Sequence, residues 1–279
     1  MPWYLDFGFQ AAQMLVFNKL KNLFGGKLRF FLSGGAPLSL EIAEFFHASG
    51  ILVLEGYGLT ENTAACNLNT HDGFKLGTVG RALPGVEVRI ADDGEIMLRG
   101  PNVFAGYYKR EDATAEALEE DGWFHTGDIG VFDDEGFLRI TDRKKDLIVT
   151  SGGKNIAPQN LENLMKTDPL ISQIMVYGDK RNFLTALITL DPDEAAAYAE
   201  HKEIEYEEFS ELADNPIIHE KMERALAAKN KKLASYETIK KFAILPEDFE
   251  IGEELTPTLQ VRRKVVTEKY WDLLDGLYA

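Results

Sequence analysis

A six-residue run, Gly56-Tyr57-Gly58-Leu59-Thr60-Glu61, brings together residue types that suit a phosphate group and a divalent cation. Its two glycines carry no side chain, so the backbone can come close to a bulky planar or phosphate group. Thr60 offers a hydroxyl and Glu61 a carboxylate, a natural pair for a phosphate oxygen and its Mg²⁺. Glu61 stands where a dinucleotide fingerprint would have its third glycine, so the run is not that fingerprint. Taken alone, the run also fits an ordinary strand-to-loop turn.

Two charged residues further along the chain, Asp128 and Arg143, are candidates for binding a sugar. Both lie in residues 121–145, which read DGWFHTGDIGVFDDEGFLRITDRKK. A carboxylate can accept hydrogen bonds from both hydroxyls of a ribose, and an arginine can donate to the same sugar or to a phosphate. Gly127 and Asp128 are expected in a turn before a short alternating strand. Taken singly, each charged residue also fits a surface position, and the nearby His125 fits a structural role.

The chain around the glycine run is expected to form a parallel β-α-β unit. Apolar residues at helical spacing follow the first of two buried strands, and glycines follow both strands. Ligands bind at the carboxyl ends of such strands, which places Gly34–Pro37 beside Gly56–Glu61. The expected elements are a strand at Lys27–Ser33, a helix at Leu40–Ala48 that could begin near Pro37, and a strand at Ile51–Glu55.

Residues 78–140 show a different pattern, which predicts an antiparallel β-barrel-like subdomain or small sheet. The pairs Asp93-Gly94 and Glu135-Gly136 are typical of tight turns between antiparallel strands. One helix, at about Glu111–Glu120, interrupts the strands. The expected strands are Val86–Ile90, Glu95–Arg99, Gly130–Phe132 and Phe137–Ile140.

The rest of the chain is expected to form a small α+β domain. The charged residues Asp142–Lys145 follow a strand end and mark a candidate boundary. Beyond them, apolar runs at Gln173–Tyr177 and Leu184–Leu190 predict a hairpin joined by Gly178–Asn182, and residues 195–232 are expected to be mostly helical. A strand at Leu147–Thr150 and a helix at Pro158–Met165 are expected before the hairpin.

Composition limits the class of partner. The chain has 46 acidic and 30 basic residues and a net charge of −16, which disfavours nucleic acid and anionic membrane surfaces as partners. Its single cysteine, Cys66, excludes an internal disulfide and fits a reducing, cytoplasmic location. No apolar run reaches about 18 residues, so no membrane span is expected. The dispersed histidines show no metal-ligand spacing.

The N-terminal segment is crowded with apolar side chains and holds one acid, Asp6. Two interpretations stay open for it. It is either a helix that packs on a domain core or an amphipathic helix in peripheral contact with a membrane. Its apolar residues are Trp3, Tyr4, Phe7, Phe9, Met14, Leu15, Phe17, Leu20, Leu23 and Phe24.

Residues 121–145 resemble the signature segment of long-chain fatty acid–CoA ligases, within the adenylate-forming superfamily. GYGLTE at 56–61 matches a core motif of that superfamily, and SGGAPL at 33–38 resembles its adenine-side loop. The resemblance covers nearly the whole chain and corresponds to the C-terminal half of the family. It implies ATP-dependent ligation of a fatty acid to CoA through an acyl-adenylate, with ATP or AMP, Mg²⁺ and CoA as ligands.

The resemblance also implies roles for individual residues. Tyr57 would stack on adenine, Thr60 would contact the α-phosphate and Glu61 would bind Mg²⁺. Asp128 and Arg143 would hold the ribose. The nucleotide contacts that it implies are completed by Gly35, Ala36, Glu55 and Gly56.

Lys145 falls on the family's hinge, about which the C-terminal domain swings between adenylation and thioester formation. The loop that follows, Ser151–Pro158, resembles the loop that enters the site in the second half-reaction and lines the pantetheine tunnel. Within it, Gly152, Gly153 and Lys154 are the expected contacts with CoA.

The chain departs from the family at Gln260, within LTPTLQVRRK at 255–264. Long-chain ligases carry a lysine there, which serves as a mobile positive charge between the carboxylate and the α-phosphate during adenylation. Glutamine keeps a donor but loses the charge, and such stabilisation is worth roughly 3–4 kcal/mol per group. The departure therefore predicts slow adenylation with a spared thioester step, unless Arg262 substitutes through a shifted loop.

The resemblance places the family's phosphate loop and most of its acyl pocket upstream of residue 1, so the isolated chain is expected to be inactive or impaired in adenylation. The first strands would then show an open sheet edge and exposed apolar surface. Three accounts stay open: a ligase fragment, a half that docks on a separate N-terminal chain, or a non-catalytic nucleotide- or partner-binding remnant. The expected divisions are part of the large α/β nucleotide-binding subdomain at 1–77, a β-rich subdomain at 78–141, a hinge at 142–146 and a mobile α+β domain at 147–279.

Overall fold

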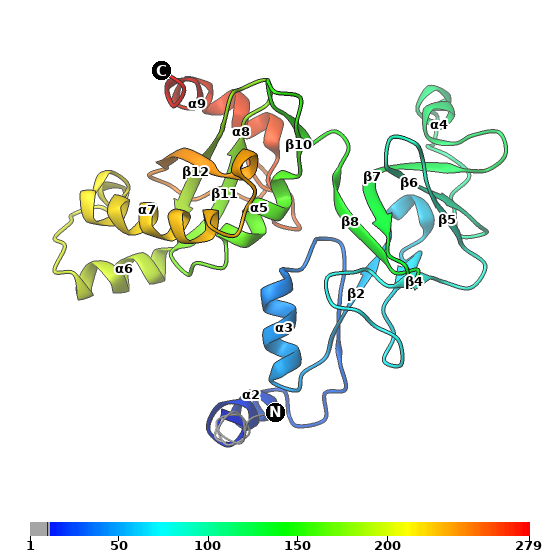
Figure 1. Ribbon diagram of the computed structural model, residues 1–279, viewed down its shortest axis with the longest axis horizontal. Helices are drawn as coiled ribbons and strands as arrows, with labels where there is room; N and C mark the ends of the chain where they lie inside the picture. The colour runs from blue at the N-terminus through cyan, green and yellow to red at the C-terminus, as the bar shows by residue number, and fades with distance from the viewer. Residues whose placement is uncertain (1–9, 11) are drawn as a thin grey trace. The chain divides into compact units, whose positions relative to one another are not determined.

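The computed structural model describes residue 10 and residues 12–279, and it divides the chain after Ile140 into two compact units (Figure 1). The expected mixture of α/β and α+β architecture is confirmed. The finer division of the first unit and the hinge at 142–146 stay predictions. Part of the N-terminal apolar set, Trp3, Tyr4, Phe7 and Phe9, lies outside the described residues.

The first sheet of unit 1 contains the predicted parallel crossover. β1 (Phe31–Ser33) pairs in parallel with β2 (Val53–Tyr57), and α3 (Leu40–Ala48) connects them. β3 (Asn67–Leu68) and β4 (Arg81–Ala82) extend the sheet in antiparallel fashion, in the order β1-β2-β3-β4. Among the described residues β1 is therefore an edge strand with a single neighbour, as the resemblance implied.

Two boundaries in this crossover differ from the predictions. β1 begins at Phe31 and not at Lys27, because its partner β2 begins only at Val53, after the turn that closes α3. α3 begins at Leu40, after Ser39 in an extended conformation, and not near Pro37. The 3₁₀ turn η2 (Thr60–Asn62) follows β2.

The second sheet of unit 1 is antiparallel, with the order β5-β6-β7-β8. The helix α4 stops at Ala117 and not at Glu120, because Leu118 forms a bridge with Phe124. The elements are β5 (Glu87–Ile90), β6 (Glu95–Arg99), α4 (Glu111–Ala117), β7 (Phe124–Phe132) and β8 (Leu138–Arg143).

The turn predicted at Gly127 and Asp128 is wrong. Both residues lie inside β7, where the ladder with β6 is interrupted: Glu95 pairs with Ile129, whereas Met97 pairs with His125. Between these two pairs the chain advances four residues on β7 but only two on β6, so β7 contains a β-bulge. Gly127 has φ +70°, the left-handed conformation that such bulges favour. A Gly-Asp pair suits a turn and a bulge equally, so the local sequence did not distinguish them.

Apolar residues near the N-terminus of unit 1 are largely exposed. The π-helix η1 (Gln13–Phe17) and α2 (Asn18–Leu23) contain no buried residue. The exposed fraction is 74% for Met14, 81% for Leu23 and 62% for Leu32 on the edge strand. The predicted exposed apolar surface is therefore present, while Phe17 of the same segment contacts Phe45 of α3 edge-on at a centroid distance of 6.5 Å.

Unit 2 is built on a three-stranded sheet in the order β11-β12-β13. β11 (Ile171–Tyr177) and β12 (Leu184–Leu190) form the predicted hairpin, and β13 (Ile239–Ile244) adds in parallel to β12. Every residue of β12 is buried, because apolar side chains cover both faces of this central strand. Packing on both faces therefore explains why the sequence of β12 is almost continuously apolar.

Helices cover the two faces of this sheet (Figure 1). α5, α6 and α7 contribute to the larger core on one face, and α8 and α9 contribute to a smaller core on the other. The elements are β9 (Ile148–Val149), β10 (Asn155–Ile156), α5 (Pro158–Met165), α6 (Pro192–His201), η3 (Phe209–Asp214), α7 (Pro216–Asn230), η4 (Ser235–Glu237), α8 (Arg263–Lys269) and α9 (Trp271–Gly276). Within the described residues, no helix has both the length and the apolar character needed to cross a bilayer.

Gly58 is expected to be indispensable for the stability of unit 1. A Cβ at this position would lie 1.4 Å from the Ala64 carbonyl oxygen, and backbone atoms cannot yield as a flexible side chain can. We expect Gly58→Ala to lower the free energy of unfolding by at least about 2 kcal/mol in urea titrations. Gly73→Ala is the matched control, because its new Cβ would meet only the Thr70 hydroxyl at 3.6 Å. Equal stabilities of the two variants would contradict this account.

Candidate active site

Tyr57 and Asp128 meet in the core of unit 1, although 71 residues separate them in the sequence. The Tyr57 hydroxyl donates to Asp128 Oδ2 at 2.6 Å, and the two residues are 7% and 4% exposed. Burial, followed by the charge of Asp128, raises the pKa of Tyr57, so its hydroxyl keeps the donated proton. The contact joins the end of β2 to the bulge of β7, and thus links the two sheets.

The loop after β1 approaches the end of β2, as predicted. A Cβ on Gly34 would lie 3.2 Å from the Gly56 carbonyl oxygen, so the two strand ends are in close contact. Gly35 and Ala36 are exposed, and Gly35 has φ +80°; a Cβ added to Gly35 would meet no atom within 4 Å. Both residues are therefore open to solvent, and the structure leaves room beside Gly35.

Glu55, in contrast, is buried and interacts with the protein. Its carboxylate accepts hydrogen bonds from the backbone N–H groups of Gly77 and Leu38, while burial raises its pKa. Gly56 also makes room for the chain itself, since a Cβ there would lie 2.9 Å from Leu68. In the described structure these two residues support the loop rather than line an open surface.

Thr60 and Glu61 lie together in the 3₁₀ turn η2, and Thr60 is exposed. Glu61 Oε1 accepts a hydrogen bond from the Tyr107 hydroxyl at 2.9 Å, and its backbone carbonyl accepts from the Phe104 N–H. Tyr107 was not among the predicted site residues. Because it lies 46 residues from Glu61 in the sequence, no spacing rule indicated it.

The turn is followed by a strained segment. Thr63 and Ala64 both have positive φ, 55° and 81°, a conformation that non-glycine residues adopt only when their surroundings impose it. Asn102 holds this segment: its amide donates to the Asn62 carbonyl, and its own carbonyl accepts from the Thr63 hydroxyl. The hydroxyl and carboxylate of Thr60 and Glu61 therefore sit on a rigid support.

The remaining predicted residues follow Ile140 in unit 2, and Arg143 among them is the last residue of β8, a strand that begins in unit 1. Lys145 is exposed, next to the unit boundary, and Arg143 is half-buried. Between them and the boundary lies Asp142, only 2% exposed, whose Oδ1 accepts from the Arg143 N–H at 2.6 Å. Asp142 Oδ2 is buried without a hydrogen-bond partner. Burial raises the pKa of Asp142 to about 6, and the Arg263 guanidinium opposes this only in part.

Gly152, Gly153 and Lys154 form the exposed tip between β9 and β10. Gly153 has φ +72°. The Thr150 carbonyl accepts a hydrogen bond from the Gly153 N–H, and the Thr150 hydroxyl accepts one from the Lys154 N–H. The Lys154 ammonium lies 5.6 Å from the centre of the Tyr236 ring. The tip therefore presents backbone and one cation to solvent, which suits contact with an extended anionic ligand.

Gln260 lies in a tight loop of unit 2. Its N–H donates to the Thr256 hydroxyl at 3.0 Å, its carbonyl accepts from the Thr256 N–H, and Leu259 before it has φ +60°. Arg262 donates to the carbonyls of Gly252 and Glu253, both at 2.8 Å. The arrangement gives Arg262 a structural task, which argues against its replacing a lysine at Gln260.

The residues present fit a magnesium ion held mainly by phosphates. Among the described residues, no group of three or more histidine, cysteine, aspartate or glutamate side chains could hold a metal ion. Mg²⁺ is usually bound by one or two carboxylates together with substrate phosphates. Glu61 supplies one carboxylate, which is partly exposed and held by Tyr107.

Comparison with known proteins identifies the family of this chain. A family model described as AMP-binding enzyme matches residues 9–108, and a second, described as AMP-binding enzyme C-terminal domain, matches residues 145–279. The chain belongs to the AMP-binding enzyme family. It is 44% identical over 266 residues to the long-chain-fatty-acid–CoA ligase FadD15 of Mycobacterium bovis, covering 95% of this chain and 44% of that ligase. The chain thus spans less than half the length of this relative.

Solved structures of AMP-binding enzymes share the fold. One is the adenylation domain of a carboxylic acid reductase from Segniliparus rugosus, solved in complex with AMP and a co-purified carboxylic acid. The match covers 92% of this chain and 40% of that one, with 27% sequence identity and a TM-score of 0.75. O-succinylbenzoate coenzyme A synthetase from Bacillus subtilis, in complex with ATP and a magnesium ion, matches 85% of this chain and 46% of its own, with 28% identity and a TM-score of 0.62.

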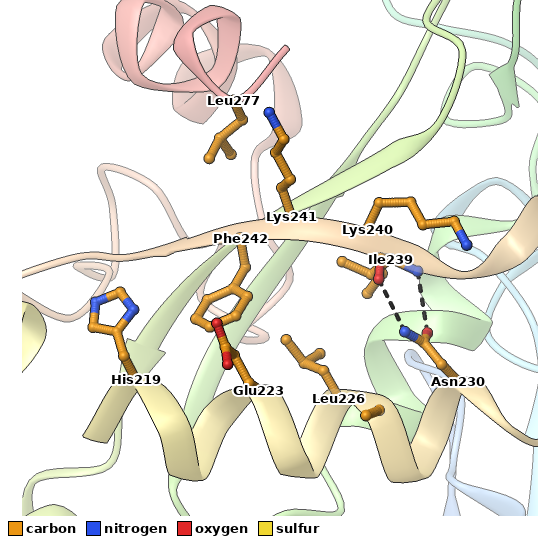
Figure 2. Close-up of a pocket in the computed structure, with 10 residues that line it drawn as sticks. His219, Glu223, Leu226, Asn230, Ile239, Lys240, Lys241, Phe242 and Leu277 are labelled. Atoms are coloured by element: carbon orange, nitrogen blue, oxygen red, sulfur yellow. Dashed lines mark hydrogen bonds between the residues drawn. The ribbon is translucent and has the colours of Figure 1, made fainter. Parts of the chain in front are cut away.

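A groove of about 400 Å³ in unit 2 of this AMP-binding enzyme contains none of the predicted site residues (Figure 2). It lies between α7 and β13, where the His219 ring stacks on Phe242 at a centroid distance of 5.6 Å. Asn230 exchanges hydrogen bonds of 2.9 and 3.1 Å with the Ile239 backbone and so ties the helix to the strand. The groove is therefore a feature of the packing between these two elements.

The buried Asp142 is expected to make stability depend on pH. Its pKa is about 6 in the folded chain and 3.8 for an unperturbed aspartate, so the folded state binds the extra proton between these values. The ionised Asp142 carboxylate destabilises the folded state. This destabilisation is absent below about pH 4, grows as the pH rises and is complete above about pH 6.5. We expect Asp142→Asn to raise the free energy of unfolding by about 2–3 kcal/mol at pH 8 and by almost nothing at pH 4.

Unfolding titrations of the wild type and Asp142→Asn at several pH values check this expectation. Asp272→Asn, at an exposed position in the same unit, is the matched control and should show no comparable pH-dependent gain. A loss of stability in Asp142→Asn at pH 8 would show that the ionised carboxylate is instead well compensated.

Proposed function

We propose that this chain forms part of a long-chain fatty acid–CoA ligase that uses ATP. The carboxylate of the fatty acid would attack the α-phosphate, releasing pyrophosphate and forming an acyl-adenylate. The CoA thiol would then attack the acyl carbon, releasing AMP and forming the acyl-CoA. The observation that carries this proposal is 44% identity to a ligase of this kind across 95% of the chain. A cytoplasmic location is part of the proposal, consistent with Cys66 being a buried free thiol.

In this proposal unit 1 holds the nucleotide. The Tyr57 hydroxyl fixes the Asp128 carboxylate, which accepts hydrogen bonds from the ribose hydroxyls. Adenine would lie over the small exposed part of the Tyr57 ring and against the open loop at Gly35 and Ala36. Thr60 would donate to the α-phosphate from the rigid turn η2.

Glu61 would hold the magnesium ion of the nucleotide. When bound, Mg²⁺ neutralises negative charge on the phosphates as the α-phosphate is attacked. The Tyr107 hydroxyl orients the Glu61 carboxylate through one oxygen, so the side chain need not reorganise when the nucleotide arrives. Glu55 would act indirectly, by fixing the loop that contains Leu38.

Unit 2 would serve the second half-reaction. Lys145 is the proposed hinge, since it is exposed and lies close to the unit boundary. Arg143 would join the ribose contacts, and the tip at Gly152–Lys154 would meet the pantetheine arm of CoA. Gln260 would stand near the reacting carboxylate during adenylation, with a neutral amide in place of a positive charge.

The exposed apolar edge of unit 1 would pack against further strands of the ligase, in the same chain or in a separate one. β1 is a parallel edge strand, and parallel strands are normally flanked and covered on both sides. Contact with a lipid surface is the alternative for this face, which co-sedimentation with vesicles would reveal. A non-catalytic nucleotide- or partner-binding role is the second candidate function, favoured by the neutral Gln260.

Binding of a non-hydrolysable acyl-adenylate mimic tests the nucleotide site. We expect micromolar affinity for the wild-type chain in calorimetry and a loss of about 100-fold or more in Asp128→Ala, because charge-assisted bonds to two hydroxyls disappear. Asp134→Ala, at an exposed turn position in the same unit, should bind as the wild type does. Equal affinities of Asp128→Ala and the wild type would show that Asp128 does not contact the ligand.

Restoring the charge at Gln260 tests the account of adenylation. In a ligase completed with an N-terminal half, we expect Gln260→Lys to raise the rate of pyrophosphate exchange by about 10²–10³. The rate of thioester formation from a supplied acyl-adenylate should stay unchanged. Gln260→Met, which has a similar length and no charge, should show no gain. An unchanged exchange rate in Gln260→Lys would mean that another group supplies the charge.

A further inference from the structure

Glu95 lies beside the proposed ribose contact and is buried to the same degree. It is 5% exposed on β6, while Asp128 is 4% exposed on β7. A buried carboxylate is unfavourable unless hydrogen bonds and charges compensate it. The partners of Glu95 therefore indicate why a charge is kept at this position.

The first partner of Glu95 is the backbone of the β7 bulge. Glu95 Oε1 accepts a hydrogen bond from the Gly127 N–H at 2.8 Å. The bulge takes residues 126–128 out of the regular ladder with β6, so their backbone groups need other partners. The Glu95 carboxylate supplies one of these partners directly before Asp128.

Thr126 supplies further hydrogen bonds within the same bulge. Its hydroxyl donates to the Ile96 carbonyl at 2.7 Å and lies 3.1 Å from the Asp128 N–H, from which it accepts. Thr126 and Glu95 thus fix the backbone on both sides of Gly127. This backbone sets the direction in which the Asp128 side chain leaves β7 and reaches the Tyr57 hydroxyl.

The second partner of Glu95 is His125. Glu95 Oε2 lies 3.2 Å from His125 Nδ1, and His125 Nε2 lies 3.1 Å from Glu119 Oε1. An ionised carboxylate only accepts hydrogen bonds, so a ring nitrogen of His125 that carries a hydrogen donates to the carboxylate it faces. Glu119 in turn accepts from Arg89 at 3.0 Å. This row of contacts, which ends at the Arg89 guanidinium, holds the Glu95 side chain in place.

We propose that Glu95 is a positioning residue that holds Asp128 in the geometry needed to bind the ribose of an adenylate. His125 and Glu119 keep the Glu95 side chain in place. The inference rests on the proposed function, because Asp128 is there the ribose contact. Glu95 acts through the Gly127 backbone and does not touch the ligand.

Hydrogen exchange at Gly127 tests the positioning role without any ligand. We expect its amide to exchange about tenfold faster or more in Glu95→Ala, because a hydrogen bond to a charged acceptor is lost. Glu95→Gln keeps an acceptor of the same length and should restore most of the protection. The control is Glu87→Ala on the neighbouring strand, whose exposed carboxylate pairs with Arg99 and not with the bulge. Unchanged exchange in Glu95→Ala would overturn the proposal.

A pair of nucleotides extends the test to binding. We expect the wild-type chain to prefer AMP over 2′,3′-dideoxy-AMP by about tenfold or more, because only AMP offers the ribose hydroxyls to Asp128. In Glu95→Ala this preference should fall toward equality while the affinity for the dideoxy nucleotide stays the same. Glu95→Gln should recover the preference.

The outcomes separate this inference from the proposed function. A purely structural role for Glu95 would weaken both nucleotides equally, and a preference retained in Glu95→Ala would overturn the inference. If the wild type shows no preference, the ribose role of Asp128 fails, and the exchange of the Gly127 amide still decides whether Glu95 holds the bulge.

Discussion

The hydrogen bond from Tyr57 to Asp128 is the contact on which the organisation of unit 1 depends. It joins a parallel sheet to an antiparallel one at a point where both partners are almost fully buried. A buried carboxylate is unfavourable unless hydrogen bonds compensate it, so the bond from Tyr57 favours the arrangement in which the two sheets meet at this point. The core packs around the same point: Tyr57 of β2 and Cys66, which directly precedes β3, meet Ile96, Leu98, Phe124 and Leu138 from the second sheet. Burial also raises the pKa of the Cys66 thiol to about 12, which leaves it unreactive.

Elements with a strong local signal could be predicted from the sequence alone. The helices at Leu40–Ala48 and Pro158–Met165 and the strand at Leu184–Leu190 match the structure at both ends, because periodicity, a proline at the helix start and an uninterrupted apolar run are local properties. β13 escaped prediction, since Lys240 and Lys241 interrupt its apolar pattern. The start of β7 escaped for another reason: only the register with β6 shows that Gly127 forms a bulge and not a turn.

The candidate site was located by resemblance, but its internal contacts were not predictable. Tyr107 reaches Glu61 across 46 residues, and Glu95 reaches Gly127 across 32. No spacing rule links such positions, and only the folded chain brings them together. The glycines of the first run show the reverse error. They were interpreted as room for a ligand, whereas Gly58 makes room for the backbone of Ala64. The sequence correctly predicted that another group comes close to this glycine, but that group is the protein backbone and not a ligand.

The separation of the cores has a consequence for how such chains diversify. The described core residues of unit 1 all precede the boundary at Ile140, and both cores of unit 2 begin after it, at Ile148 and Met175. Genetic recombination near this boundary would exchange one unit without dividing any hydrophobic core. Under the proposed function, unit 1 could therefore acquire a new partner unit, and with it a different acceptor for the activated acyl group, in a single inherited event.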